Sequence, residues 1–153
     1  MLITPGYKAG NQTIHDRQPM WGSSALRWLD PVLVNAKAIG AHTVLDYGCG
    51  KGHLKLKLVK WGHEVREYDP GIPGKDGEPE LADMVAGLDV MEHIEPECLQ
   101  FVLRDLARCV KQVGYFTIHT GPAGKTLPDG RNTHLIQKDV KWWRTKLSRY
   151  FSV

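Results

Sequence analysis

The segment TVLDYGCGKG, residues 43–52, carries the strongest structural signal in this chain. Its apolar start, residues 43–45, predicts a short buried strand, which an aspartate and three alternating glycines follow without a break. Glycine lets the backbone turn with a positive φ and approach another group closely, so the strand is expected to end in a tight loop. The leucines at 54 and 58 then predict a helix that Gly62 ends, with its first turn directed at whatever the loop binds.

The glycine spacing G-x-G-x-G argues against two common nucleotide-binding classes. The dinucleotide fingerprint G-x-G-x-x-G needs its third glycine where this chain has His53. A P-loop needs a four-residue spacer and a lysine followed by serine or threonine, whereas Lys51 is followed by Gly52. The loop therefore indicates either a different ligand or a tight turn that binds nothing.

Strands and helices alternate along the rest of the chain. Further strands are expected over residues 64–68, 82–88 and 115–119. Helices are expected over residues 23–39 with a break at Pro31, from Glu95 to before Gly114, and over residues 140–150. Residues 69–80 and 121–133 are rich in glycine and proline and predict loops. The alternation predicts an α/β fold with a Rossmann-like doubly wound, mainly parallel sheet and helices on both faces.

In such a fold the ligand crevice lies at the carboxyl ends of the strands. Residues 46–52, 69–74, 89–95 and 119–124 occupy these positions. Asp69 follows the second strand, where a carboxylate can accept hydrogen bonds from both hydroxyls of a ribose. A surface Asp-Pro turn is the alternative for Asp69 alone, and it is disfavoured once the glycine loop is considered with it.

Three motifs in this order resemble those of the class I S-adenosylmethionine-dependent methyltransferases. Residues 44–52 look like the first motif of that family, and Asp69 looks like the acid after its second strand. Residues 89–94, DVMEHI, are similar to the D-V-x-E-H stretch of the branch that acts mostly on small molecules. The later spacing, through residues 114–118 and 134–151, also fits that branch, so the resemblance covers residues 43–153.

The resemblance implies S-adenosylmethionine as cofactor and assigns its contacts. Asp46 and the backbone of Gly48 and Gly50 would hold the methionine end, and Asp69 would bind the ribose. Pro70 or Ile72 would flank the adenine, and Asp89 and Val90 would lie near the sulfonium. The implied cofactor-binding set is Asp46, Gly48, Cys49, Gly50, Gly52, Asp69, Pro70, Ile72, Asp89 and Val90. Carboxylates at several strand ends suit a ligand that carries two cationic groups.

The chain departs from the family pattern in two places. Only the loop of residues 70–81 separates Asp69 from the next strand, where the family has a helix and a strand. The sheet is therefore expected to lack an edge strand, with Asp76 or Glu78 replacing the acid that the family places near the adenine amine. The chain also ends at Val153, where the last hairpin of the family's sheet would begin, so a shortened sheet is expected.

Histidines are the candidates for proton chemistry. His93 follows the third expected strand and His119 ends the fourth, so both are predicted to be catalytic residues that face the methyl acceptor. His134 is a weaker candidate. For His93 the alternative is a histidine whose nitrogens are satisfied by its surroundings near the start of the long helix. No His, Cys, Asp and Glu residues have the sequence spacing of a zinc or calcium site, so no metal is expected.

Length and composition suit one domain, residues 1–153, with a polar N-terminal arm over residues 1–22. Tyr7 and Trp21 would anchor the arm over the site. The net charge of +3 is too small to identify a partner. Three cysteines without a C-x-x-C pair, and the lack of a long apolar run, predict a cytoplasmic protein without disulfides or membrane spans. The oligomeric state is not indicated.

Three functions remain open. The first is a methyltransferase that acts on an oxygen or nitrogen of a small-molecule or saccharide-like acceptor. The second is a protein that binds S-adenosylmethionine, to sense or sequester it, without transfer. The third, an RNA methyltransferase, rests on the basic residues that alternate with Trp142 and Trp143 near the C-terminus. It is disfavoured, because residues 140, 143, 147 and 150 form an ordinary buried stripe. Enzymes that methylate the amino groups of DNA bases carry a [DN]-P-P-[YFW] motif, and this chain has residues 89–92, DVME, in its place. Methylation of adenine or cytosine amines in DNA is therefore disfavoured as well.

Overall fold

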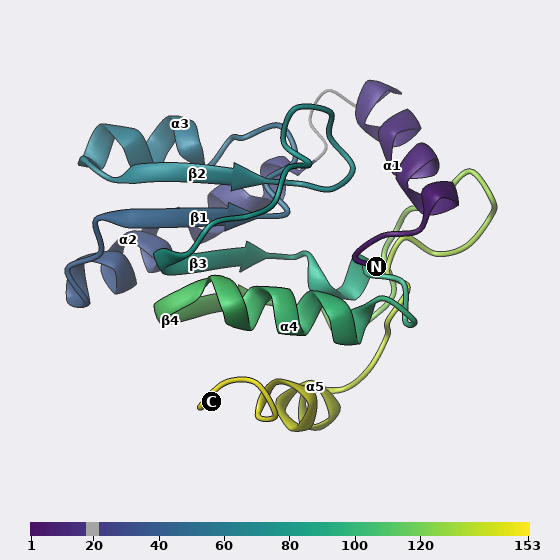
Figure 1. The fold of residues 1–153 in the computed structure, drawn as a ribbon. Coiled ribbons are helices and arrows are strands. Elements are labelled where there is room, and N and C mark those ends of the chain that lie inside the picture. The colour runs from purple at the N-terminus through teal and green to yellow at the C-terminus, as the bar shows by residue number, and fades with distance from the viewer. Residues whose placement is uncertain (18–21) are drawn as a thin grey trace.

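The computed structural model describes residues 1–17 and 22–153, and in this part of the chain four strands form one sheet (Figure 1). The strands are β1 (Thr43–Tyr47), β2 (Glu64–Tyr68), β3 (Ala82–Leu88) and β4 (Val110–Thr117). They pair in the order β2-β1-β3-β4, and every ladder is parallel. The α/β class and the parallel sheet expected from the sequence are confirmed.

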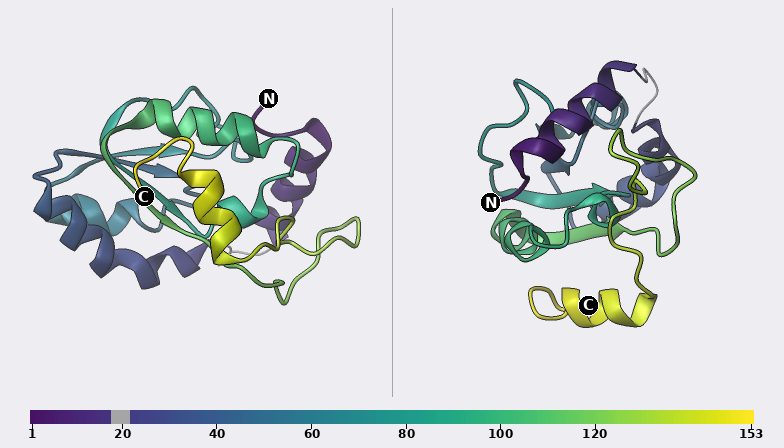
Figure 2. Two further views of the ribbon diagram at one scale, coloured as in Figure 1. Left: turned by 90° about the horizontal axis from the view of Figure 1, so that it is seen from below. Right: turned by 90° about the vertical axis from the view of Figure 1, so that its right-hand side faces the viewer.

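Helices cover both faces of the sheet, as a doubly wound fold requires. α2 (Leu29–Ala38) and α3 (Lys55–Leu58) pack on one face, and α4 (Leu99–Cys109) and α5 (Val140–Leu147) lie on the other (Figure 2). Neighbouring strand residues point to opposite faces, so Val44 packs with the α2 side and Leu45 with the α4 side. All seven residues of β3 are buried, because this strand has a neighbour on each edge and helices on each face.

The loop of residues 69–81 carries the chain from β2 to β3 without a helix or strand. Within the described residues the sheet therefore ends at β2, which confirms the expected loss of an edge strand. Short 3-10 turns occupy Ser23–Trp28, Val59–Trp61 and Met91–His93. The break expected near Pro31 is present, although α2 already starts at Leu29, two residues before the proline.

The junction between α4 and β4 differs from the sequence prediction. α4 spans Leu99–Cys109 and β4 begins at Val110, so the strand starts five residues earlier than expected. Val110 continues the apolar stripe of the helix, but its backbone pairs with Ala82 of β3. Gly114 lies inside the strand and does not end the helix. Pairing with β3 thus overrides the helical periodicity at this point.

The N-terminal segment also differs from its prediction, because residues 5–17 form a helix, α1 (Pro5–Arg17), in place of an irregular arm. Thr4 caps it: its hydroxyl oxygen accepts a hydrogen bond from the N–H of Tyr7 at 3.2 Å. Proline is favoured in a first helical turn, so Thr4-Pro5 was the sequence signal for this helix. α1 lies at the carboxyl ends of the strands (Figure 1). Trp21 lies outside the described residues.

Polar contacts near its start attach α1 to the rest of the molecule. Thr4 donates through its N–H and its hydroxyl to the buried carboxylate of Glu95, at 2.9 and 2.7 Å. Lys8 pairs with Asp76 of the β2–β3 loop at 2.8 Å. The helix is thus connected to two loops at the carboxyl edge of the sheet.

The C-terminal helix is held by aromatic packing. Trp143 and Leu147 are buried against the α4 side of the core, and the ring of Phe151 lies 5.2 Å from that of Phe116. Val140 is 61% exposed, so it does not belong to the stripe expected for this helix. Across the described residues, no helix has both the length and the apolar character needed to cross a bilayer.

At the amino edge of the sheet, Asp83 joins three strands. Its carboxylate accepts hydrogen bonds from the N–H groups of His42 and Thr43 at 3.0 and 2.9 Å, and from Lys111 at 2.8 Å. The hydrogen bond from Lys111, followed by those from Thr43, holds the pKa of Asp83 well below its usual range. The ionised carboxylate therefore stabilises the start of β1, β3 and β4 together.

We predict that Asp83→Asn lowers the free energy of unfolding at pH 7, because an amide cannot accept all of these hydrogen bonds as a charged group does. In the unfolded chain this carboxyl titrates near its ordinary pKa of about 3.9, so the wild type loses the contribution as the pH falls below about 4. Urea denaturation should show the difference between the two proteins narrowing from pH 7 to pH 3. Exposed Glu97→Gln removes one negative charge as a control, and a difference that does not depend on pH would contradict the assignment.

Candidate active site

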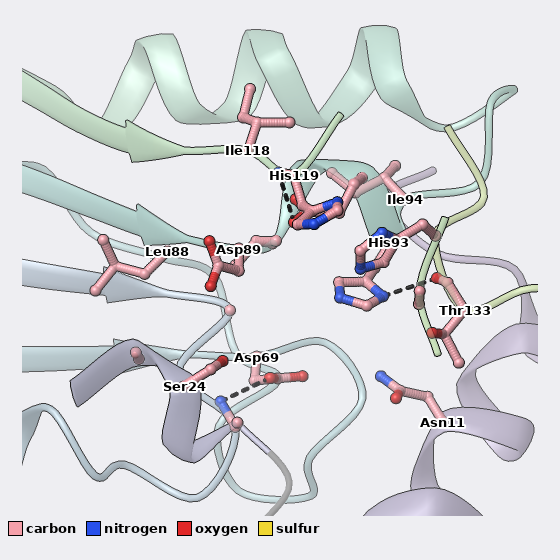
Figure 3. Close-up of a pocket in the computed structure, with 18 of the residues that line it drawn as sticks. Asn11, Ser24, Asp69, Leu88, Asp89, His93, Ile94, Ile118, His119 and Thr133 are labelled. Carbon is pink, nitrogen blue, oxygen red and sulfur yellow. Dashed lines mark hydrogen bonds between the residues drawn. The ribbon is translucent and has the colours of Figure 1, made fainter. Parts of the chain in front are cut away.

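A cavity of about 960 Å³ opens at the carboxyl ends of the strands. Its walls come from the glycine loop after β1, the residue after β2, the β3–α4 connection and the chain that follows β4. Tyr7, Asn11 and His15 of α1 also line it, and so do residues of the 3-10 turn Ser23–Trp28. Figure 3 shows Asp69, which follows β2, and Asp89 and His93, which both follow β3, around one open space. The crevice expected from the strand order is thus present, and α1 covers part of it.

The glycine loop lies directly against the wall formed by the β3–α4 connection. Gly48 has a φ of +77°, and a Cβ atom there would lie 2.6 Å from a methyl group of Val90. Both the backbone conformation and the close contact therefore require glycine at this position. Val90, expected beside the cofactor, packs on the loop and lines the same cavity.

Asp69 connects the glycine loop to the end of β2. One carboxylate oxygen accepts from the N–H of Gly50 and the other from the N–H of Gly71, each at 2.9 Å (Figure 3 shows the first). Each carboxylate oxygen can accept a second hydrogen bond, so Asp69 can hold the loop and still bind hydroxyl groups in the cavity. Asp69 thus lies in the cavity, and its ribose-binding role stays a prediction.

Three charged side chains, Lys55, Glu67 and Lys75, support the glycine loop from its other side. Lys75 donates to the carbonyl of Gly50 at 3.0 Å and to the carboxylate of Glu67 at 2.9 Å, and Lys55 donates to Glu67 at 3.0 Å. Neither Lys75 nor Glu67 was expected to take part, since no sequence motif marks them. Asp76 and Glu78, the expected substitutes near the adenine, do not line the cavity and pair with Lys8 and Arg108.

Asp46 is a buried carboxyl group at the end of β1 that lines the cavity. Burial, followed by the nearby carboxylate of Glu67, raises the pKa of Asp46 to about 7. A cationic ligand beside it would favour the ionised form and would in turn be stabilised by it. The site is therefore matched to a positively charged group at this end of the cavity.

Asp89 is held in a strained conformation, with a φ of +54°. The hydroxyl of Thr117 donates to one of its carboxylate oxygens at 2.7 Å, and the indole N–H of Trp28 approaches the other at 3.4 Å. Such strain at a non-glycine residue is typical of functional sites, where the surrounding structure holds it in place. Sequence reasoning missed Thr117 and Trp28, because the two residues lie on other elements.

Three histidines gather at the other end of the cavity. The ring of His134 lies between those of His93 and His119, with centroid separations of 4.8 and 4.9 Å. His93 donates from Nδ1 to the carbonyl of Thr133 at 2.7 Å, and burial lowers the pKa of His93 to about 4, so its ring is neutral at pH 7. His134, the weaker candidate from the sequence, occupies the centre of the cluster.

Glu92 lies beneath this cluster and is fully buried. One carboxylate oxygen accepts from the N–H of His119 at 2.9 Å, and burial raises the pKa of Glu92 to about 7. A buried carboxyl group beside three histidines gives this end of the cavity the groups needed to bind, donate or accept protons.

The structure places most of the predicted site residues in this cavity. Those that line it are Asp46, Gly48, Cys49, Gly50, Asp69, Pro70, Asp89, Val90, His93 and His119. Gly52 and Ile72 do not line it. A Cβ atom on Gly52 would meet the carboxylate of Glu67, on the outer side of the loop, and Ile72 lines a separate shallow hollow with Lys51 and Lys75. The loop turns away from the cavity after Gly50, which separates these two residues from the rest.

The two tryptophans of the terminal helix differ in exposure. Trp143 is buried in the core, Trp142 is half-buried, and the ammonium of Lys146 lies 5.1 Å from the centre of the Trp142 ring. Trp143 is therefore not exposed for stacking on bases, as nucleic-acid binding through this helix would need. The basic residues that alternate with them lie along the outer side of an ordinary amphipathic helix.

We predict that Gly48→Ala destabilises the protein more than Gly74→Ala. Both glycines have a positive φ, +77° and +84°, so both alanines cost about 1 to 2 kcal/mol of backbone strain. Only the alanine at position 48 would also collide with Val90, at a further cost of about 1 to 3 kcal/mol, since nothing lies within 4 Å of a Cβ at Gly74. Urea denaturation measures the difference, and adding Val90→Ala should reduce it. Equal stability of the two single variants would contradict the contact.

No protein-family model matches this sequence, and no curated protein matches it. Among solved structures, the chain is similar to the 1,6-didemethyltoxoflavin-N1-methyltransferase of Burkholderia thailandensis, which was crystallised with bound 1,6-didemethyltoxoflavin and S-adenosylhomocysteine. The sequence identity is 21%, the match covers 97% of this chain and 79% of that enzyme, and the TM-score is 0.65. The chain therefore shares the fold of that methyltransferase.

Proposed function

We propose that this chain is an S-adenosylmethionine-dependent methyltransferase that acts on an oxygen or nitrogen of a small-molecule acceptor. The observation that carries the proposal is the position of the glycine loop, Asp69 and Asp89, which follow three neighbouring strands and line one cavity. The shared fold with a methyltransferase whose crystal structure contains S-adenosylhomocysteine supports the same assignment.

In this proposal the donor lies along the glycine loop. Its ammonium group lies near Asp46, and its ribose hydroxyls bind the oxygens of Asp69 that already hold the loop. Asp89 faces the sulfonium, and its side chain is oriented in advance by Thr117 and Trp28. Acidic groups along this path compensate the two positive charges of the donor. Pro70 lines the cavity beside Asp69, as the residue that flanks the adenine.

The acceptor lies at the histidine end of the cavity. In the transfer step an oxygen or nitrogen of the acceptor attacks the methyl carbon, the carbon–sulfur bond breaks, and its electron pair stays on the sulfur. The reaction is an in-line displacement, so holding the two molecules in contact supplies most of the acceleration. His93 and His119 are the proposed catalytic residues, which hold the acceptor and receive or relay the proton that it loses.

The size of the cavity favours transfer over binding alone. Pockets for one drug-sized ligand occupy about 300 to 1,000 Å³, and the cavity of about 960 Å³ lies at the upper limit of this range. The cavity extends past Asp89 to the histidines. A donor bound along the glycine loop would leave this histidine end open for an acceptor. A protein that only sequesters the donor has no need of this second region.

The donor-binding role predicts that Asp69→Asn weakens the binding of S-adenosylhomocysteine by about 1.5 to 3 kcal/mol, or roughly 10- to 150-fold. An asparagine has no negative charge, and only one of its two side-chain groups is an oxygen. Its NH₂ group would therefore face the N–H of either Gly50 or Gly71, where the wild type has an acceptor oxygen. Titration calorimetry measures the affinity. Glu78→Gln, in the same loop but exposed and outside the cavity, is the matched control and should bind as the wild type does. A wild-type chain that does not bind the compound would remove the donor assignment.

The acceptor role predicts that His119→Ala slows methyl transfer by at least about tenfold and leaves S-adenosylhomocysteine affinity unchanged. The test uses donor labelled in its methyl group and fractions of a small-molecule extract, first to find the fraction that takes up the label and then to compare variants. His42→Ala, at the opposite edge of the sheet, is the control. Tight donor binding without label in any fraction would favour the alternative of a binding protein without transfer.

A further inference from the structure

Glu92, His93 and His134 form a group that the spacing of these residues in the sequence did not reveal. One potential ligand atom from each lies within 4.8 Å of the other two. Glu92 and His93 come from the connection between β3 and α4, and His134 comes from the long segment between β4 and α5. The sequence-based expectation of no metal considered spacing along the chain, whereas this group is assembled by two segments that meet in the fold.

Glu92 itself indicates that a ligand belongs there. It is 0% exposed, and among the described residues its Oε2 atom has no hydrogen-bond partner, whereas its Oε1 accepts from the N–H of His119 at 2.9 Å. A buried carboxylate oxygen without a partner is costly unless a cation or a proton compensates it. A cation bound between Glu92 and the two rings would supply that partner.

The two histidines are oriented as metal ligands commonly are. Nδ1 of His93 lies 2.7 Å from the carbonyl of Thr133, and Nδ1 of His134 lies 2.7 Å from the carbonyl of Gly121. A carbonyl can only accept, so the proton of each neutral ring is on Nδ1 and the lone pair is on Nε2. A backbone carbonyl behind one ring nitrogen typically fixes the tautomer of a histidine that binds metal through the other.

We propose that Glu92, His93 and His134 bind a divalent first-row transition-metal cation. Two imidazole nitrogens and one carboxylate oxygen suit Zn²⁺, Co²⁺ or Fe²⁺, whereas Ca²⁺ and Mg²⁺ prefer oxygen ligands alone. Three protein ligands leave at least one coordination position for water or for an oxygen atom of a molecule in the cavity.

Metal binding requires a small closure of the group. Bonds of about 2.0 to 2.2 Å place tetrahedral ligands about 3.3 Å apart, so the atoms that now lie within 4.8 Å must approach by up to about 1.5 Å. His134 is the ligand best able to move, because it belongs to a long segment between elements, whereas Glu92 and His93 lie in a 3-10 turn at the start of the α4 connection.

This inference goes beyond the proposed function and does not depend on it. A cation at this position lies at the histidine end of the cavity, where it would act as a Lewis acid on an oxygen of a bound molecule. With the cation bound, Nε2 of His93 would be a ligand, and His119 would be the histidine that receives the proton of the acceptor. The test therefore measures cation binding without any methyl donor, so that failure of the metal site and failure of donor binding are separate results.

The experiment uses the full chain without a polyhistidine tag, stripped of metal with a chelator and then titrated with Co²⁺. Visible absorption of the bound cobalt reports the coordination, and competition with Zn²⁺ reports the affinity. The wild type is expected to bind one equivalent. Glu92→Gln and His134→Ala should each weaken the affinity at least about tenfold, and His42→Ala should leave it unchanged.

Circular dichroism and thermal unfolding establish which variants are folded. Should Glu92→Gln fail to fold, His134→Ala decides the question, because its side chain is only half-buried and lies outside the helices and strands. Binding of one equivalent that depends on His134 and not on His42 supports the site. A wild-type chain that takes up no stoichiometric Co²⁺, or a His134→Ala variant that binds as tightly as the wild type, overturns it.

Discussion

The hydrogen bonds of Asp69 hold the carboxyl edge of this molecule together. Its two carboxylate oxygens bind the N–H groups of Gly50 and Gly71, so one side chain sets the distance between the loop after β1 and the loop after β2. Lys75 adds a second link from the same β2–β3 loop to the carbonyl of Gly50. These hydrogen bonds hold the glycine loop in place without a ligand, which lowers the cost of ordering it on binding.

This arrangement concentrates negative charge where burial makes it expensive. Burial raises the pKa values of both Asp46 and Glu92 to about 7, so each end of the cavity contains a carboxyl group that a bound cation would stabilise. At the amino edge, by contrast, the carboxylate of Asp83 accepts hydrogen bonds from Thr43 and Lys111, which join three strands. One edge of the sheet thus secures the fold, while the other carries groups whose charges are only partly compensated, as is common at functional sites.

Much of the fold follows from local pattern. Alternation of apolar strands with amphipathic helices predicted the parallel sheet, and the lack of any helix or strand in residues 69–81 was visible in the glycines and prolines there. The positions of Asp69 and Asp89 after their strands were equally predictable, because a parallel sheet brings its carboxyl ends together. The prediction placed the start of β4 too late, because pairing with β3 overrides the helical periodicity there. It also missed α1, because the Thr4 cap outweighs the glycine-rich composition of that segment.

By itself, the sequence determined where β2 and β3 end and therefore that Asp69 and Asp89 face the crevice, since both depend on a periodicity of two to four residues. Tertiary structure alone decided that Lys75 supports the glycine loop and that His134 lies between His93 and His119. The physical reason is that these contacts join segments far apart in the chain, and the paths of the connecting loops are set by packing and hydrogen bonding over the whole molecule, which no local pattern encodes.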